Sequence, residues 1–432
     1  MKFVLGILVL SLVIFFHELG HFLLAKASHI VVNEFAFGMG PKILSFTKGE
    51  TTYAWRILPF GGSCTMMGED EEEEAAEGCF NRAPVLNRIA VVAAGPLFNF
   101  LMAFIVSMIV IGTVGSDPAT VVEVGEGTPV EEAGLKAGDL ILSYQGNSIA
   151  NGRELYTDLE LDDVPLKDIR LIVKRDGQKI AINYDPVVTT RYMLGYYYNQ
   201  EDTSRAEVLD VIEDYPMAAA GFMAGDILTS IDGFEITTQE SLQEYWKEHP
   251  LDGSPVVLTA DRQGETYSAE ITPIEDTSAA LGFSFNLMRE KLSPFGVLKA
   301  SWGEIRYWIH VTIKSLKTLI TGQYHVDDLS GPVGVVSAMG DTYDEVKSEG
   351  TLVVAMTFLN FIILLSANLG IMNLLPIPAL DGGRLVFLVI ELILRRPLNR
   401  KVENYVHIVG LMLLMLLMVF IMYNDLMKIF IR

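Results

Sequence analysis

The sequence predicts an α-helical polytopic membrane protein with four transmembrane helices, a membrane-associated β-hairpin loop and two α+β domains. Four apolar runs are long enough to cross a bilayer. The region between the second and third runs is polar and contains an internal repeat. The mean hydropathy of +0.34 exceeds that of most soluble proteins, yet it is low for a chain embedded throughout. We therefore expect membrane helices at both ends and folded domains outside the bilayer in the middle.

The apolar runs and the segments between them divide the chain into nine parts. The expected parts are 1–26 (first transmembrane helix), 27–88 (β-hairpin loop), 89–115 (second transmembrane helix), 116–199 and 200–290 (two α+β domains), 291–350 (an amphipathic interfacial helix and a connector), 351–383 (third transmembrane helix), 384–404 (cytoplasmic loop) and 405–425 (fourth transmembrane helix). Apolar residues at steps of three and four favour the interfacial helix, and a core-packed helix of the outer domain fits the same pattern.

The positive charges predict the orientation. Lys and Arg residues gather in the loop between the first two spans and in the short loop between the last two. Such loops lie on the cytoplasmic side, so both termini and the polar middle are expected outside. The formal net charge of −22 argues against nucleic-acid binding. Cys64 and Cys79, the two cysteines, provide no disulfide framework.

The first apolar run contains the motif His17-Glu18-Leu19-Gly20-His21. Histidines four residues apart lie on one face of a helix, so both imidazoles can bind a single Zn²⁺, and the Glu can act as general base on an activated water. A secretory signal peptide would explain the apolar run but not these three polar side chains. Charged and metal-binding residues at bilayer depth are costly, which indicates function.

A third zinc ligand is expected near the end of the third span. A catalytic zinc takes three protein ligands, and the other histidines lie in positions that fit surface or interface roles. The segment from Asn373 to Gly383 contains Pro376 and Pro378, which break the helix, followed by Asp381. Irregular backbone at this depth lies beside protein or water. Asp381 is therefore the candidate ligand, with a simple helix cap as the alternative.

The polar middle contains two copies of one sequence pattern. The segment beginning at Pro129 recurs at Pro216, an offset of 87 residues, with the shared features Ala-Gly and Ala-Gly-Asp. The pattern resembles PDZ domains in a bacterial arrangement. Leu194-Gly195-Tyr196 resembles the PDZ loop whose backbone N–H groups bind a peptide carboxylate, and Leu281-Gly282-Phe283 repeats it. PDZ domains bind extended peptides at a sheet edge, although two inert spacer domains would show the same pattern.

Taken together, the motifs resemble the site-2 proteases, the intramembrane zinc metalloproteases, and in particular the bacterial regulator-of-sigma-E protease group with tandem PDZ domains. The resemblance covers nearly the whole chain. The motifs that carry it are His17 to His21, Pro59 to Gly62, Ala94 to Phe100, the two repeats, Gly331 to Gly334 and Asn373 to Gly383. Residues 63–66, Ser-Cys-Thr-Met, depart from the bulky aromatic or valine that is more usual after the two glycines, which leaves the hairpin contacts open.

The resemblance implies a role for each motif residue. His17, His21 and Asp381 would bind one zinc ion, and Glu18 would be the catalytic base. The remaining roles are substrate binding for Asn373, Pro376, Pro378, Gly61 and Gly62, close helix packing for Gly95 and Asn99, and carboxylate binding for Leu194, Gly195 and Tyr196.

The resemblance further implies a multi-pass protein of the bacterial inner membrane, with extracytoplasmic PDZ domains and an active site toward the cytoplasmic side. It would cleave single-span membrane proteins, such as anti-sigma factors and remnant signal peptides, after another protease has trimmed their outer part. The PDZ pair would bind peptide C-termini or act as a size filter. The alternatives are a non-catalytic scaffold presenting PDZ domains, a membrane-anchored protease for soluble chains and, least favoured, a transporter.

Overall fold

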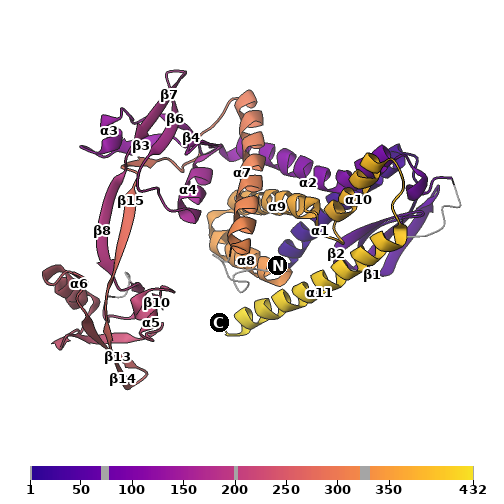
Figure 1. Cartoon of the computed structure of the whole chain (residues 1–432). Coiled ribbons are helices and arrows are strands. Elements are labelled where there is room, and N and C mark those ends of the chain that lie inside the picture. Colours follow the sequence, from indigo (N-terminus) through magenta and orange to yellow (C-terminus); the bar gives the residue numbers. More distant parts are fainter. Residues whose placement is uncertain (1, 70–76, 199–202, 322–330, 432) are drawn as a thin grey trace. The chain divides into compact units, whose positions relative to one another are not determined.

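The computed structural model describes residues 2–69, 77–198, 203–321 and 331–431, and the chain forms two compact units. The first unit contains Met1–Ala119, Ile149–Thr157 and Asn286–Arg432, and the second contains Thr120–Ser148 and Asp158–Phe285. Figure 1 shows that the first unit is dominated by helices and that most of the short strands belong to the second.

The first unit contains the long apolar helices. Its helices are α1 (Lys2–Ala27), α2 (Val85–Val114), α7 (Pro294–Ile320), α8 (Pro332–Val346), α9 (Thr351–Leu374), α10 (Asp381–Leu394) and α11 (Arg400–Ile431), with short 3₁₀ turns at Phe80–Arg82 and Lys347–Glu349. By length and composition, four stretches could cross a membrane: Phe3–Ala27, Val85–Val114, Thr351–Leu374 and Arg400–Met427. These are the four spans that the sequence predicts, with shifted ends.

The end of α1 has a defined local cause. His29 adopts a left-handed conformation with φ of 58°, and the Ile30 N–H donates to the Ala25 carbonyl at 2.9 Å. This is the Schellman-type pattern by which helices commonly end. The next residues leave the helix direction and enter the first strand.

A shared apolar core joins α1, α2, α8 and α9. The buried residues of this core are Val9, Val13, Met102, Met339, Phe358 and Ile362. Helix α7 adds to the bundle because Ile305 packs among buried residues of α2 and α9. The same helix leaves Phe295, Trp302 and Ile320 largely exposed. Helix α7 therefore packs one side against the other helices, whereas a purely interfacial helix would contact only lipid and water.

Two expected boundaries differ from the observed helices. The third span, expected over 351–383, ends at Leu374, because Pro376 favours extended backbone at the preceding residue. The segment expected as a cytoplasmic loop, 384–404, is mostly helical, since it contains all but the first three residues of α10 and the start of α11. Helix α10 has only 14 residues and is too short to span a bilayer, so span-length criteria pass over it.

The loop between α1 and α2 forms an antiparallel β-hairpin, as the sequence predicts. Strand β1 (Val32–Lys48) pairs with β2 (Thr51–Met66), and the register shifts several times along the ladder. The outer half of β1 is exposed, including Met39, Leu44 and Phe46. Toward its base, β1 packs against α1 through ring contacts such as Phe22–Phe35, at 4.8 Å between centroids.

The second unit contains most of two copies of one arrangement, offset by 87 residues, while Ile149–Thr157, which includes the start of α4 in the first copy, belongs to the first unit. The first series is β3 (Val121–Val124), α3 (Pro129–Glu132), β4 (Leu140–Tyr144), β5 (Asn147–Ser148), α4 (Gly152–Leu161), β6 (Ile169–Arg175), β7 (Gln178–Tyr184), β8 (Val187–Met193) and β9 (Tyr196–Tyr198). The second series is β10 (Val208–Val211), α5 (Pro216–Ala219), β11 (Ile227–Ile231), β12 (Phe234–Glu235), α6 (Gln239–Glu248), β13 (Val256–Arg262), β14 (Glu265–Ile271), β15 (Ile274–Ala280) and β16 (Phe283–Phe285).

The two copies exchange their last strands. Strand β9 of the first series pairs with β10 of the second, and β16 of the second series pairs with β3 of the first. The connecting strands β8 and β15 pair with each other along their whole length, as Figure 1 shows. The pairing is symmetric about Thr190, which lies opposite its repeat equivalent Thr277.

The expected division into 116–199 and 200–290 does not follow these pairings. The boundary itself lies at residues 199–202, outside the described residues. On either side of it, each folded copy takes a strand from the other series, so no single cut separates two complete domains. Strand pairing between distant segments leaves no local signal in the sequence, so the sequence alone does not reveal this exchange.

Candidate metal centre

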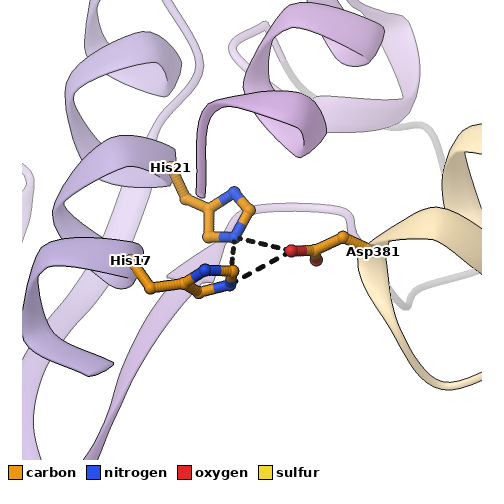
Figure 2. A group of neighbouring side chains, drawn as sticks. All are labelled: His17, His21 and Asp381. Atoms are coloured by element: carbon orange, nitrogen blue, oxygen red, sulfur yellow. Dashed lines mark hydrogen bonds and ion pairs between the residues drawn. The ribbon is translucent and has the colours of Figure 1, made fainter. Parts of the chain in front are cut away.

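The structure brings the three predicted metal ligands together. His17 and His21 lie one turn apart on α1, and both rings point toward Asp381, the first residue of α10 (Figure 2). Their Nε2 atoms lie 3.2 Å apart, and Asp381 Oδ2 lies 3.1 Å from His17 Nε2 and 3.4 Å from His21 Nε2. Within the described ranges, no other group of three His, Cys, Asp or Glu residues is arranged for a metal ion.

This donor set fits zinc. Tetrahedral bonds of about 2.0–2.1 Å separate neighbouring ligand atoms by about 3.3 Å, which matches the three distances above. Two imidazoles and one carboxylate also form a common ligand set for a catalytic zinc, with a fourth position left for water or substrate. Asp381 Oδ2 is buried and takes part in no geometrically acceptable hydrogen bond, as expected for an atom whose partner is a cation.

Helix α2 sets the orientation of His21. The His21 Nδ1 atom lies 2.8 Å from the backbone carbonyl of Val91. A carbonyl can only accept, so Nδ1 carries the proton and Nε2 presents its lone pair to the site. Without a cation, this lone pair would face two further acceptor atoms, which is unfavourable.

Two asparagines contact His17. The Asn99 amide nitrogen lies 3.3 Å from His17 Nδ1, and the Asn373 amide nitrogen lies 3.4 Å from His17 Nε2. Asn99 Oδ1 is buried without a hydrogen-bond partner. A rotation of the Asn99 amide by 180° would let Oδ1 accept a proton from His17 Nδ1, which would again leave Nε2 as the ligand atom. The family resemblance implies close packing for Asn99, and the structure adds a contact with His17, a candidate ligand.

Glycine permits the close approach of α1 and α2 at the site. A Cβ atom at Gly95 would lie 2.3 Å from His21 Nε2 and 2.7 Å from His17 Cε1. A Cβ atom at Gly20 would lie 2.4 Å from the Ala94 carbonyl oxygen. Any larger residue at Gly95 would occupy space used by the two imidazoles, so the predicted packing role has a steric basis.

The Asp381 carboxylate reaches the histidines because the chain turns tightly before α10. A Cβ atom at Gly382 would lie 2.1 Å from the Leu375 carbonyl oxygen, and one at Gly383 would lie 2.4 Å from that of Ile377. Pro376 and Pro378 lie within this turn and have no N–H to donate. The two prolines therefore shape the backbone between α9 and α10.

Of the other predicted site residues, Gly61 and Gly62 lie in the β-hairpin and three others lie in the second unit. Gly62 of β2 faces Glu18, since a Cβ atom there would lie 3.1 Å from Glu18 Cγ, and its neighbour Gly61 has φ of 88° and faces Met39. Leu194, Gly195 and Tyr196 belong to the second unit and line a cavity of 600 Å³ together with Trp246 of α6.

Sequence reasoning missed three contacts around the ligands. Val91 contributes only a backbone carbonyl, which no side-chain motif can reveal. Arg88 forms a buried ion pair with Glu391 of α10, and His407 contacts the turn before Asp381. A charged residue at the end of an apolar run was the only available signal for Arg88.

Comparisons with known proteins place the chain among zinc metalloproteases. The model of the peptidase family M50 matches residues 5–417. The chain is 31% identical to the zinc metalloprotease RasP of Geobacillus kaustophilus, over 98% of this chain and 97% of the relative. It is 33% identical to the regulator of sigma-W protease RasP of Bacillus subtilis, over 98% of both chains. A putative zinc metalloprotease of Treponema pallidum is 27% identical, again over 98% of both.

Proposed function

Because the chain belongs to peptidase family M50 and is an intramembrane zinc metalloprotease, we propose that it cleaves peptide bonds within the transmembrane segments of single-span membrane proteins. The observation that carries this proposal is the convergence of His17, His21 and Asp381. Two of these ligands lie on α1, a helix apolar and long enough to cross a bilayer. A protease site in such a helix is suited to substrates that are themselves embedded.

We assign zinc binding to His17, His21 and Asp381, and the role of general base to Glu18. A bound zinc supplies Lewis-acid activation of the attacking water and of the scissile carbonyl. The Glu18 carboxylate accepts a proton from the water and returns it to the leaving amine. The Val91 carbonyl keeps His21 in the tautomer that presents Nε2, which maintains the site between turnovers.

The substrate must be unwound before cleavage, because a helix hides its peptide bonds in internal hydrogen bonds. Gly62 of β2 lies against Glu18, so an extended segment that pairs with this part of the hairpin would pass the catalytic base. The amide of Asn373 is suited to bond the exposed substrate backbone, and the turn containing Pro376 and Pro378 provides the adjoining wall. We assign substrate binding to these residues and to Gly61.

We assign PDZ-like peptide binding to the second unit. The cavity beside Leu194, Gly195 and Tyr196 is bounded by β9 and by Trp246 of α6, which is the arrangement of a strand and a helix that holds a peptide C-terminus in PDZ domains. A trimmed substrate would present such a C-terminus. The positive charges of the loops support an extracytoplasmic position for this unit and a cytoplasmic-side active site in the bacterial inner membrane.

The substrates proposed are anti-sigma factors and remnant signal peptides, after a first protease has removed their outer part. The name of the Bacillus subtilis relative, regulator of sigma-W protease, supports the first class.

The deciding experiment compares the wild type with Glu18→Gln. Both proteins are co-expressed with tagged single-span proteins, and the fragments are mapped by mass spectrometry. The variant should bind zinc like the wild type and release no fragment cut within the transmembrane segment. Cleavage by the variant at the wild-type rate would refute the assignment of Glu18. Cuts only outside the membrane segment would favour a protease for soluble chains, and a protein that binds no zinc would favour a scaffold.

A further inference from the structure

Helix α11 contacts the turn that leads to Asp381 at two positions. The Ala379 backbone N–H donates to His407 Nδ1 at 2.9 Å. Gly410 lies three residues further along α11 and therefore on the same face of the helix. A Cβ atom at Gly410 would lie 2.4 Å from Pro378 Cβ and 2.8 Å from the Pro378 carbonyl oxygen. Pro378 and Ala379, which are adjacent in the turn, thus contact Gly410 and His407, which are adjacent on one face of α11.

The turn depends on outside support. Ala379 has φ of 76°, a left-handed conformation that costs a non-glycine residue free energy and persists only where its surroundings hold it. Within the turn, Ile377 N–H donates to the Leu375 carbonyl and Leu380 N–H to the Ile377 carbonyl. Helix α10 begins without a side-chain cap. The hydrogen bond to His407 therefore stabilises the strained residue two positions before Asp381.

Helix α11 is otherwise weakly packed. Only 6% of its most apolar window is buried, against 28–39% for the other three candidate spans. Near its C-terminal end, the Asp425 carboxylate accepts hydrogen bonds from the backbone N–H groups of Gly331 at 3.0 Å and Gly334 at 2.8 Å, at the start of α8. A helix with so little buried surface owes its placement to such specific contacts.

We propose that His407 and Gly410 act together as a clamp that positions Asp381 for zinc binding. His407 and Gly410 are positioning residues, since they hold the backbone of Pro378 and Ala379 and contact no ligand atom. If α11 moves away, the turn relaxes and the carboxylate leaves the point where the two Nε2 atoms converge. Zinc affinity therefore depends on the packing of α11 against the turn at Pro378 and Ala379. The inference rests on the proposed role of Asp381 as a ligand.

The test measures zinc affinity of the full-length protein in detergent by competition with a chelator. His407→Phe keeps an aromatic ring beside Phe387, whose ring centroid lies 5.6 Å away, but it cannot accept a hydrogen bond. His407→Asn places an oxygen acceptor near the position of Nδ1. Loss of an outer partner of a ligand typically lowers metal affinity about 10–100-fold, which is the loss expected for His407→Phe. His407→Asn should recover most of the affinity.

Gly410→Ala should lower zinc affinity in the same range, because its methyl group displaces Pro378. Leu416→Ala is the matched control, since Leu416 lies on the same helix and is 71% exposed. The proposal would be overturned if His407→Phe bound zinc as tightly as the wild type. It would also be overturned if His407→Phe and His407→Asn lost zinc affinity to the same extent. Asp381→Asn separates the two assignments. If Asp381→Asn keeps full zinc affinity, Asp381 is not a ligand and that part of the proposed function fails. If Asp381→Asn loses zinc while His407→Phe binds zinc like the wild type, only the proposed role of His407 and Gly410 is refuted.

Discussion

Arg88 and Glu391, 303 residues apart in the sequence, form a buried bidentate ion pair with nitrogen–oxygen distances of 2.6 and 3.1 Å. The pair ties the first turn of α2 to the last turns of α10. Val91, one turn further along α2, accepts the hydrogen bond of His21. The beginning of α2 is therefore connected both to His21 and to the helix that starts with Asp381.

Removing one partner of this pair should destabilise the protein strongly. Arg88→Met leaves the Glu391 carboxylate buried with only the more distant Arg400, 3.8 Å away, and such a loss typically costs about 3–5 kcal/mol. The double variant Arg88→Met, Glu391→Met should recover much of this loss, because it leaves no buried charge without its partner. Thermal unfolding in detergent measures both, with the exposed Arg82→Met as the control. A double variant no more stable than Arg88→Met would contradict the expectation.

Gly95→Ala should abolish zinc binding. The added methyl group would lie 2.3 Å from His21 Nε2, and the backbone of α2 cannot retreat while Val91 remains bonded to His21. Gly112→Ala is the matched control, because Gly112 lies on the same helix with open space around it. Metal content after dialysis distinguishes the two variants. Stoichiometric zinc in Gly95→Ala would show that the site can widen.

Asn99→Leu should weaken zinc binding about 10–100-fold, the usual effect of losing the partner of a histidine ligand. Asn99→Asp keeps an oxygen near His17 Nδ1 and should stay close to the wild type. Chelator competition on purified protein gives both constants. Equal affinities for the Leu and Asp variants would mean that the contact only fills space.

The second unit should lose stability in acid. Hydrogen bonds from Arg262 hold the pKa of Asp226 below its ordinary value, although burial alone would raise it. A carboxyl with a lowered pKa in the folded state stabilises that state above its unfolded pKa of about 3.9, and this contribution is lost as the pH falls further. Stability should therefore be constant near neutral pH with respect to this group and decline below about pH 4.

In Arg262→Met the burial of Asp226 is no longer opposed, so its folded-state pKa is no longer held below the unfolded value. The variant should therefore be less stable than the wild type at neutral pH, and its acid decline should be smaller. Arg205→Met is the control, because Arg205 is 56% exposed and its distance to Glu207 is 3.7 Å. Trp246 reports on this unit by fluorescence once Trp55, Trp302 and Trp308 have been replaced by Phe. Superimposable acid profiles for Arg262→Met and the wild type would show that the pair does not set the decline.

The features that local sequence predicts best are the four long apolar helices and the convergence of His17, His21 and Asp381. Uninterrupted apolar runs identify candidate spans, and the spacing of His17 and His21 places both on one helix face. A third ligand must then come from a side chain that returns to the same depth. Asp381 stood out because prolines and glycines surround it. Helix α10 could not be recognised in the same way, because it is shorter than a bilayer span, contains Arg384 and is followed by Arg395 and Arg396.

The contacts that orient the ligands were beyond sequence reasoning for a different reason. The bonds from Val91 and His407 involve backbone atoms, whose partners depend on how distant helices pack. The strand exchange in the second unit is hidden from the sequence for a similar reason. The composition of β9 does not indicate which of the two copies it pairs with.

The exchanged strands also determine the order in which the second unit can be completed during synthesis. Strand β3 emerges from the ribosome first, but its partner β16 follows ~160 residues later, a delay of about 10–30 s at about 5–20 residues per second. Throughout that interval one edge of the nascent first copy has no native neighbour. The copy that is translated earlier is thus the one that closes last, and a premature stop anywhere before Phe283 leaves it open.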